Sequence, residues 1–276
     1  MINESYFQNS AGEKFRYMEK AAAAPKAVIL GVHGYAEHIG RYAGHISEFF
    51  VQRGFSFFMM ENRGHGKSVG RKGHIDRFDQ FIDDLHVFRK MVDKRAGGLP
   101  VFMLAHSNGS LISARYVLAH GDGIRGLVLS GIPIRTAAKV NPVKLKVGML
   151  LAGVVPKFSM PTELDPYTLC HDKEIVDDYV ADPLVHKIMS VGFAKGFLDA
   201  MADLLARAGE FRSPVLFQHG GDDRACDPPS AREFYSKIAS TDKQFVMYDT
   251  LWHEIYNEPG NEGILKTGAE WMEKRI

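Results

Sequence analysis

Continuous apolar runs that alternate with amphipathic helical segments constrain this chain more than any other feature of its sequence. The runs occupy residues 27–34, 55–60, 101–104, 126–133, 214–220 and 243–249. A strand that is apolar throughout is typical of a parallel sheet with both faces covered. Segments between the runs repeat apolar residues at helical spacing, as in Phe81, Leu85 and Phe88. The alternation therefore predicts an α/β fold, with a mostly parallel central sheet and helices on both faces.

Two regions depart from this alternation. From Ser5 to about Lys20, two short alternating segments flank the turn NSAGE and predict an N-terminal hairpin. The strand and helix rhythm stops after Ile134, where helical stretches replace it, and returns near residue 212. We predict that 1–134 and 212–276 form one core domain, and that 135–211 is an inserted, mostly helical cap, or lid.

Composition and charge indicate where the protein is located and which classes of partner it binds. The 34 basic and 33 acidic residues leave a formal net charge of +1, which does not attract nucleic acid or an anionic membrane. The N-terminus lacks the basic and apolar pattern of a secretory signal, and the apolar stretch at 147–155 is too short to span a bilayer. Two cysteines, Cys170 and Cys226, suit a reducing compartment better than a disulfide framework. We expect a cytoplasmic protein with no nucleic-acid partner and no transmembrane segment.

One serine lies at a sharp change from strand to helix. The apolar run ending at Leu104 stops at small residues, and a helical pattern with Leu111, Ile112 and Tyr116 begins at once after Ser107. Such a bend lifts a hydroxyl clear of the sheet and directs the first N–H groups of the helix at whatever reacts there. Ser107 is therefore a candidate nucleophile, although a serine between small residues is often only part of a turn.

A serine nucleophile needs a base and a carboxylate that orients the base. In parallel sheets, reactive side chains follow the carboxyl ends of strands. Asp222 and Asp223 follow the run at 214–220, and His253 follows the run at 243–249. The chain order of serine, then aspartate, then histidine is the order of the hydrolase fold with a nucleophile elbow. An oxyanion hole is expected from the backbone N–H groups of Tyr35, in the segment HGYAEH, and Asn108.

The segments HGYAEHIGRY, NRGHGKSVG, AHSNGS, HGGDDRACD and WHEIYNE resemble, in order and spacing, the monoacylglycerol lipase and lysophospholipase branch of the α/β-hydrolases, of the serine aminopeptidase S33 type. The resemblance implies the α/β-hydrolase fold. It also implies a Ser107 nucleophile, an Asp223 acid in preference to Asp222, a His253 base and an oxyanion hole at Tyr35 and Asn108.

Three residues depart from the family pattern. Ala105 and Ser110 stand where the family usually has glycine, and Glu61 stands where it usually has aspartate. We expect the first two to make a slightly atypical elbow, and Glu61 to matter for structure rather than for the triad.

Other site types fit the sequence less well. His33 and His38 belong to no zinc-binding motif, and GHGKS lacks the first glycine of a phosphate loop because Glu61 holds that position. No metal and no organic cofactor is therefore expected. In the cap, Met149, Leu150, Leu151 and Val154 are candidate substrate-binding residues. Transient contact of this stretch with a lipid surface is the lesser alternative, because such residues more often pack the cap.

These observations favour a serine carboxylic-ester hydrolase that works through an acyl-enzyme on a small-molecule acyl ester. The resemblance and the apolar cap suggest a monoacylglycerol or a lysophospholipid. Fold and triad do not decide the bond that is cleaved, so thioesterase, amidase, carbon–carbon hydrolase and haloperoxidase reactions stay open. So does a non-catalytic ligand-binding protein on the same fold. The oligomeric state is left open by the sequence.

Overall fold

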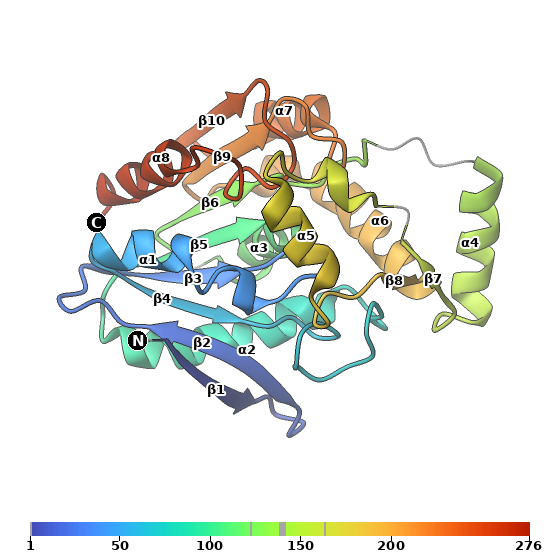
Figure 1. Cartoon of the computed structure of the whole chain (residues 1–276), viewed down its shortest axis with the longest axis horizontal. Coiled ribbons are helices and arrows are strands. Elements are labelled where there is room, and N and C mark those ends of the chain that lie inside the picture. Colours follow the sequence, from blue (N-terminus) through green and yellow to red (C-terminus); the bar gives the residue numbers. More distant parts are fainter. Residues whose placement is uncertain (1, 122, 138–141, 163) are drawn as a thin grey trace.

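The computed structural model describes residues 2–276 except 122, 138–141 and 163 (Figure 1). Within these residues, eight strands form one sheet in the order β1-β2-β4-β3-β5-β6-β9-β10. The strands are β1 (Asn3–Gln8), β2 (Lys14–Lys20), β3 (Ala27–Val32), β4 (Phe55–Met60), β5 (Val101–His106), β6 (Gly126–Ser130), β9 (Val215–Gly220) and β10 (Lys243–Tyr248). β1 and β2 form an antiparallel hairpin that joins β4, and the remaining pairs from β4 to β10 are parallel. The predicted hairpin and mostly parallel sheet are confirmed.

Successive side chains of each central strand point to opposite faces of the sheet. Both faces are therefore apolar, and helices cover both of them. Val28 and Leu30 of β3 belong to one core cluster, and Ile29 between them belongs to another. The first cluster includes apolar residues of α2 (Asp79–Ala96), α3 (Asn108–His120) and α7 (Pro228–Lys237). The second cluster includes residues of α1 (His45–Gln52) and α8 (Glu262–Glu273). The predicted covering on both faces is therefore confirmed.

In its described part, the segment between β6 and β9 contributes no strand to the main sheet. It contains α4 (Pro142–Val154), β7 (Ser159–Pro161), α5 (Lys173–Ala181), β8 (Ile188–Ser190) and α6 (Val191–Ala206), and β7 pairs with β8 alone. Helix α6 buries Phe193, Met201 and Leu204 in the first core cluster, so part of this segment packs on the sheet domain. The predicted cap, 135–211, includes residues 138–141 and 163, which lie outside the described residues.

Helix α4 lies at the edge of the molecule beside α6 (Figure 1). Leu150 and Val154 on this helix are 73% and 81% exposed. Met149 is also exposed and Leu151 is half-buried. Among the helices of the described residues, none is both long and apolar enough to cross a bilayer.

Candidate active site

Ser107 occupies the single residue between β5 and α3, and its backbone is strained. Its φ of 53° and ψ of −124° lie outside the regions that residues with a side chain usually adopt. The Ser107 N–H donates to the Ser130 carbonyl at the end of β6, over 2.9 Å. The strain is therefore held by the neighbouring strand, as expected of an elbow that presents a reactive side chain.

The small residues around Ser107 have identifiable contacts. Ala105 is buried in β5, paired in register with Val32 of β3. The Ser110 hydroxyl donates to the Ser130 carbonyl over 2.8 Å, so this departure from glycine adds a bond between α3 and β6. Gly109 is the residue that sequence reasoning missed: a Cβ there would lie 2.1 Å from the Val32 carbonyl oxygen. A glycine in the first turn of a helix was the available signal for this close approach.

Asp223 and His253 meet at the carboxyl ends of β9 and β10. The Nδ1 atom of His253 lies 2.7 Å from Oδ2 of Asp223, and both side chains are buried. The other Asp223 oxygen accepts hydrogen bonds from the Ala225 and Cys226 N–H groups, at 2.8 and 2.9 Å. Asp222 is exposed, so the structure separates the two aspartates that follow β9.

Electrostatics keep the Asp223 carboxylate ionised. Burial would raise its pKa, but the nearby His253 and His219 side chains hold the pKa of Asp223 well below its ordinary value. Burial likewise would lower the pKa of His253, and the carboxylates of Asp223, Glu254 and Glu37 reverse that effect and raise it. An ionised aspartate on Nδ1 orients the ring so that Nε2 is free to accept a proton.

Cys226 joins Ser107 to this pair, whereas the sequence had indicated only a free thiol with no role at the site. Ligand atoms of Cys226, Asp223 and His253 all lie within 4.8 Å of one another. Burial and then the Asp223 charge raise the pKa of the Cys226 thiol far above its ordinary value, and a hydrogen bond with the Ser107 side chain opposes that rise. These three ligand atoms are near enough to hold a metal ion, but such an ion would compete with the 2.7 Å bond between His253 and Asp223.

The expected oxyanion loop follows β3 and lies against the elbow. A Cβ added to Gly34 would come within 3.2 Å of the Ser107 Cβ, so the two segments are in contact at this point. The Gly34 N–H donates to Oε1 of Glu37 over 2.5 Å, and Ala36 has a left-handed φ of 69°. The Tyr35 hydroxyl donates to the Ile188 carbonyl, which directs that side chain away towards β8. The loop is therefore a tight turn whose backbone lies beside Ser107.

Asn108 begins helix α3 and is completely buried. None of the residues that the structure describes hydrogen-bonds its side-chain amide. A buried, unpaired amide is costly in a folded protein, so its persistence at the start of α3 needs an explanation. The sequence had suggested a role only for the backbone N–H of this residue.

The candidate substrate-binding residues of α4 are not packed around the elbow. Leu150 and Val154 are the most exposed of them, and a small cavity in the described part of the chain is lined elsewhere, by residues that include Arg41, His106 and Glu254. Exposure of apolar side chains on α4 is a feature of the tertiary structure, because the helical pattern alone does not show which side is covered.

Comparisons with known proteins agree with this geometry. The family model described as "Serine aminopeptidase, S33" matches residues 23–260. A monoacylglycerol lipase of Mycolicibacterium smegmatis is 32% identical over 90% of this chain and 88% of its own length. An uncharacterized abhydrolase domain-containing protein of Dictyostelium discoideum is also 32% identical over 91% of this chain, which spans only 27% of that larger protein.

The fold has close counterparts among solved structures. The crystal structure of a monoacylglycerol lipase from Paleococcus ferrophilus matches 95% of this chain and 99% of its own, with a TM-score of 0.85 and 26% identity. The predicted α/β-hydrolase fold is confirmed. The chain belongs to the serine aminopeptidase S33 family, and it is a serine hydrolase of the carboxylesterase and monoacylglycerol lipase type.

Proposed function

We propose that this protein hydrolyses monoacylglycerols, with Ser107, Asp223 and His253 as the catalytic triad. The observation that carries the proposal is the strained Ser107 elbow beside a buried His253–Asp223 pair with a 2.7 Å hydrogen bond. The relatives named as monoacylglycerol lipases support this substrate class. Lysophospholipids and similar acyl esters are chemically related substrates, whose hydrolysis should be compared with that of monoacylglycerols.

The reaction proceeds in two steps. In the first, Nε2 of His253 accepts the Ser107 hydroxyl proton as the serine oxygen attacks the ester carbonyl, and His253 then protonates the departing glycerol oxygen. The Asp223 carboxylate stabilises the imidazolium through Nδ1. In the second step, water gives a proton to His253 and attacks the acyl-enzyme. The fatty acid leaves as Ser107 regains its proton.

Charge develops on the carbonyl oxygen in both steps. We assign its stabilisation to the backbone N–H groups of Tyr35 and Asn108. The contact between Gly34 and Ser107 supports this assignment because it brings the Tyr35 segment beside the elbow. So does the place of Asn108 at the start of α3, where helix N–H groups are free to bind an anion. Each such donor typically contributes about 3 kcal/mol to the transition state.

We assign residues 135–211 to a cap over a core formed by 1–134 and 212–276. The exposed apolar side chains of α4 support a transient contact of this cap with a lipid surface, from which a monoacylglycerol is taken up. Met149, Leu150, Leu151 and Val154 then act at the entrance rather than at the reacting bond. The free thiols of Cys170 and Cys226, both in the described part of the chain, suit the cytoplasmic location that we propose.

The test is hydrolysis of a series of 1-monoacylglycerols and p-nitrophenyl esters, with a lysophospholipid as a competing ester and with an acyl thioester and an anilide as competing bond types. We expect fatty acid release, with kcat/KM rising with chain length because each buried methylene contributes about 0.8 kcal/mol. Ser107→Ala should lower kcat on the order of a millionfold and abolish labelling by a fluorophosphonate. Retained esterase activity in this variant, or a preference for the thioester or anilide, contradicts the proposal.

A further inference from the structure

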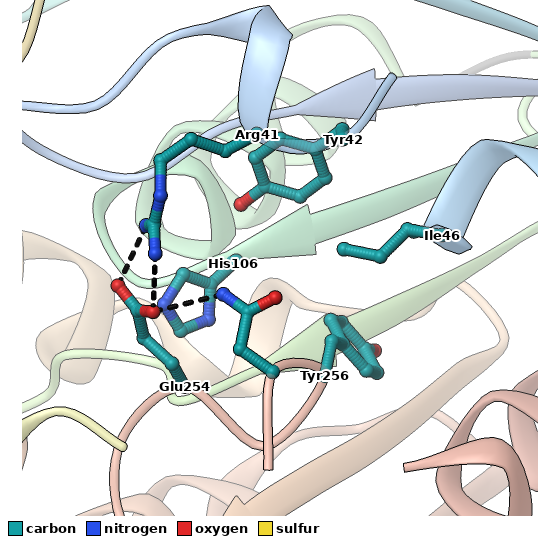
Figure 2. Close-up of a pocket in the computed structure, with 7 residues that line it drawn as sticks. Arg41, Tyr42, Ile46, His106, Glu254 and Tyr256 are labelled. Carbon is teal, nitrogen blue, oxygen red and sulfur yellow. Dashed lines mark hydrogen bonds and ion pairs between the residues drawn. The ribbon is translucent and has the colours of Figure 1, made fainter. Parts of the chain in front are cut away.

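A buried arginine connects the two loops that carry the proposed oxyanion donor and the proposed base. The Arg41 guanidinium binds both carboxylate oxygens of Glu254, at 2.7 and 2.6 Å, and one oxygen of Glu37 at 2.8 Å (Figure 2 shows the Glu254 contacts). The side chains of Arg41, Glu37 and Glu254 are 11%, 4% and 6% exposed. We call these three residues the Arg41 clamp.

One carboxylate of the clamp shapes the loop after β3. Oε1 of Glu37 accepts hydrogen bonds from the Gly34 N–H at 2.5 Å and from the Tyr42 hydroxyl at 2.7 Å. The residue next to Gly34 is Tyr35, whose N–H is the proposed oxyanion donor. Ala36, with its left-handed φ of 69°, is strained, and a strained residue persists only where its surroundings hold it. Glu37 supplies that support, and Arg41 fixes Glu37.

The other carboxylate belongs to the residue directly after His253. Beyond its two bonds to Arg41, Glu254 accepts a hydrogen bond from the Asn257 side chain at 2.8 Å. Its backbone N–H donates to the Leu169 carbonyl at 2.8 Å. Glu254 is therefore held by side chain and backbone, which restrains the backbone that carries the adjacent His253.

We propose that Arg41 and Glu254 are positioning residues, which hold the proposed base and the proposed oxyanion loop in one fixed geometry across the elbow. This inference rests on the proposed function. Residues 41 and 254 belong to distant parts of the chain, and a bidentate pair is the side-chain contact that fixes both distance and angle. A displacement of about 1 Å between reacting groups can cost roughly 100-fold in rate.

The clamp also adds charge close to the base. Its one guanidinium and two carboxylates leave a net negative charge beside His253. The titratable groups near His253 are Asp223 and Cys226 from the loop after β9, Glu37 from the loop after β3, His106 from the end of β5, and Glu254. Arg41 pairs with Glu37 and Glu254, and His219 lies 3.2 Å from the Asp223 oxygen that His253 binds. Arg41, despite burial of the pair, holds the pKa of Glu254 well below its ordinary value, so this carboxylate is charged at neutral pH. A charged Glu254 favours the imidazolium form of His253.

The experiment compares Glu254→Gln with the wild-type protein on one monoacylglycerol. We expect kcat to fall about 10- to 100-fold with KM within about threefold, because the reacting groups are misplaced while the acyl site is unchanged. The acid limb of the pH profile of kcat/KM should move to lower pH, because a carboxylate that favours imidazolium is lost. A purely structural role for Glu254 would not move this limb.

Asp84→Asn is the matched control. Asp84 is a buried carboxylate on α2 that binds the Arg63 guanidinium through two hydrogen bonds of 2.9 Å. This substitution disrupts a buried pair of an arginine and a carboxylate, as Glu254→Gln does. The disrupted pair does not include any of the groups near His253. It should lower thermal stability and leave both kcat and the acid limb as in the wild-type protein.

The outcomes separate the clamp from the triad. A wild-type kcat and acid limb in folded Glu254→Gln overturns the clamp, even if Ser107→Ala is inactive. Activity that survives in Ser107→Ala overturns the proposed function instead. If Glu254→Gln does not fold, Arg41→Lys provides the test: it keeps the positive charge but loses the bidentate pair. Lowered kcat with an unmoved acid limb in Arg41→Lys supports positioning, and an unchanged kcat overturns it.

Discussion

Gly109 lies directly against the Val32 carbonyl, so close that a Cβ on Gly109 would come within 2.1 Å of that oxygen. The contact joins the first turn of α3 to the end of β3, from which the loop with Tyr35 begins. The elbow at Ser107 and the proposed oxyanion loop are therefore set against each other by a backbone contact that tolerates no side chain.

Gly109→Ala should destabilise the protein and reduce its activity together. The neighbouring atoms are backbone, so the start of α3 has to move, and overpacking of this kind costs about 1–3 kcal/mol. The change should be measured by urea unfolding and by monoacylglycerol hydrolysis. Gly148→Ala on α4 is the matched control, since a Cβ there meets nothing within 4 Å. That control should keep its activity and be as stable as the wild-type protein or more so. Equal behaviour of the two variants would contradict the role of the contact.

Asp223→Asn should lower kcat by about 10⁴ with little change in KM. An amide in place of the carboxylate favours the wrong imidazole tautomer and no longer stabilises the imidazolium. Asp222→Asn is the control, because Asp222 is exposed and does not contact His253 through any bond of the described residues. Steady-state kinetics of the two variants decide between the aspartates. A larger loss in Asp222→Asn would show that the acid has been assigned to the wrong residue.

The free energy of unfolding should fall as the pH falls below about 6.5. Burial lowers the pKa of His33 and of His106 to about 3, whereas an unfolded histidine titrates near 6.5. Between these values the unfolded chain binds more protons than the folded one, so stability is full above this window and is lost through it. Each such histidine should cost on the order of 2 kcal/mol at pH 5.

Urea unfolding of His106→Asn at pH 7 and pH 5 measures this effect. The asparagine can keep a hydrogen bond to the Ser130 hydroxyl, which lies 2.8 Å from Nδ1 of His106. The loss of stability between the two pH values should be smaller in the variant than in the wild-type protein. An identical loss in both proteins would mean that His106 binds its proton in the folded state too.

Asn108→Leu should make the protein more stable and less active. No described residue pairs with the buried Asn108 amide, and an unpaired buried polar group costs about 1–3 kcal/mol, which leucine avoids at similar size. If the amide meets the substrate, kcat should fall about tenfold, equivalent to about 1.4 kcal/mol. Thermal unfolding measures the change in stability, and steady-state kinetics measure the change in kcat.

Ser113→Ala on the same helix is the control for Asn108→Leu. The buried Ser113 hydroxyl is likewise unpaired among the described residues, but it lies six positions beyond the elbow serine, on α3. Its removal should leave kcat unchanged. A destabilised Asn108→Leu would show that the amide has a partner that stabilises the fold.

Much of the core follows from local sequence patterns. Strand and helix periodicity located the strands from 27 onward and the helices that cover them, because apolar spacing reports which face of an element is buried. The change of pattern at Ser107 identified the turn that the structure shows at φ 53°. Chain order placed Asp223 and His253 after strands whose ends meet at one edge of the sheet.

Features that depend on distant pairing did not follow in this way. Periodicity places α6 within a cap, yet the helix buries Phe193 and Leu204 in the main core, which is decided by what packs against it. Sequence motifs included Arg41 and Glu254, but nothing local indicates that a guanidinium and a carboxylate 213 positions apart form a bidentate pair. The place of Cys226 at the site and the close approach of Gly109 to Val32 were likewise not indicated by the sequence.

The sequence by itself determined the α/β alternation, the turn at Ser107 and the order of the residues proposed to act with it, since each depends on backbone preference and on the spacing of apolar side chains. The family resemblance had preferred Asp223 to Asp222, but only the tertiary structure shows Asp223 buried against His253, how Arg41 connects two loops and which side of α4 is left exposed. The physical reason is that hydrogen-bond geometry, burial and pKa depend on groups that folding brings together from distant parts of the chain.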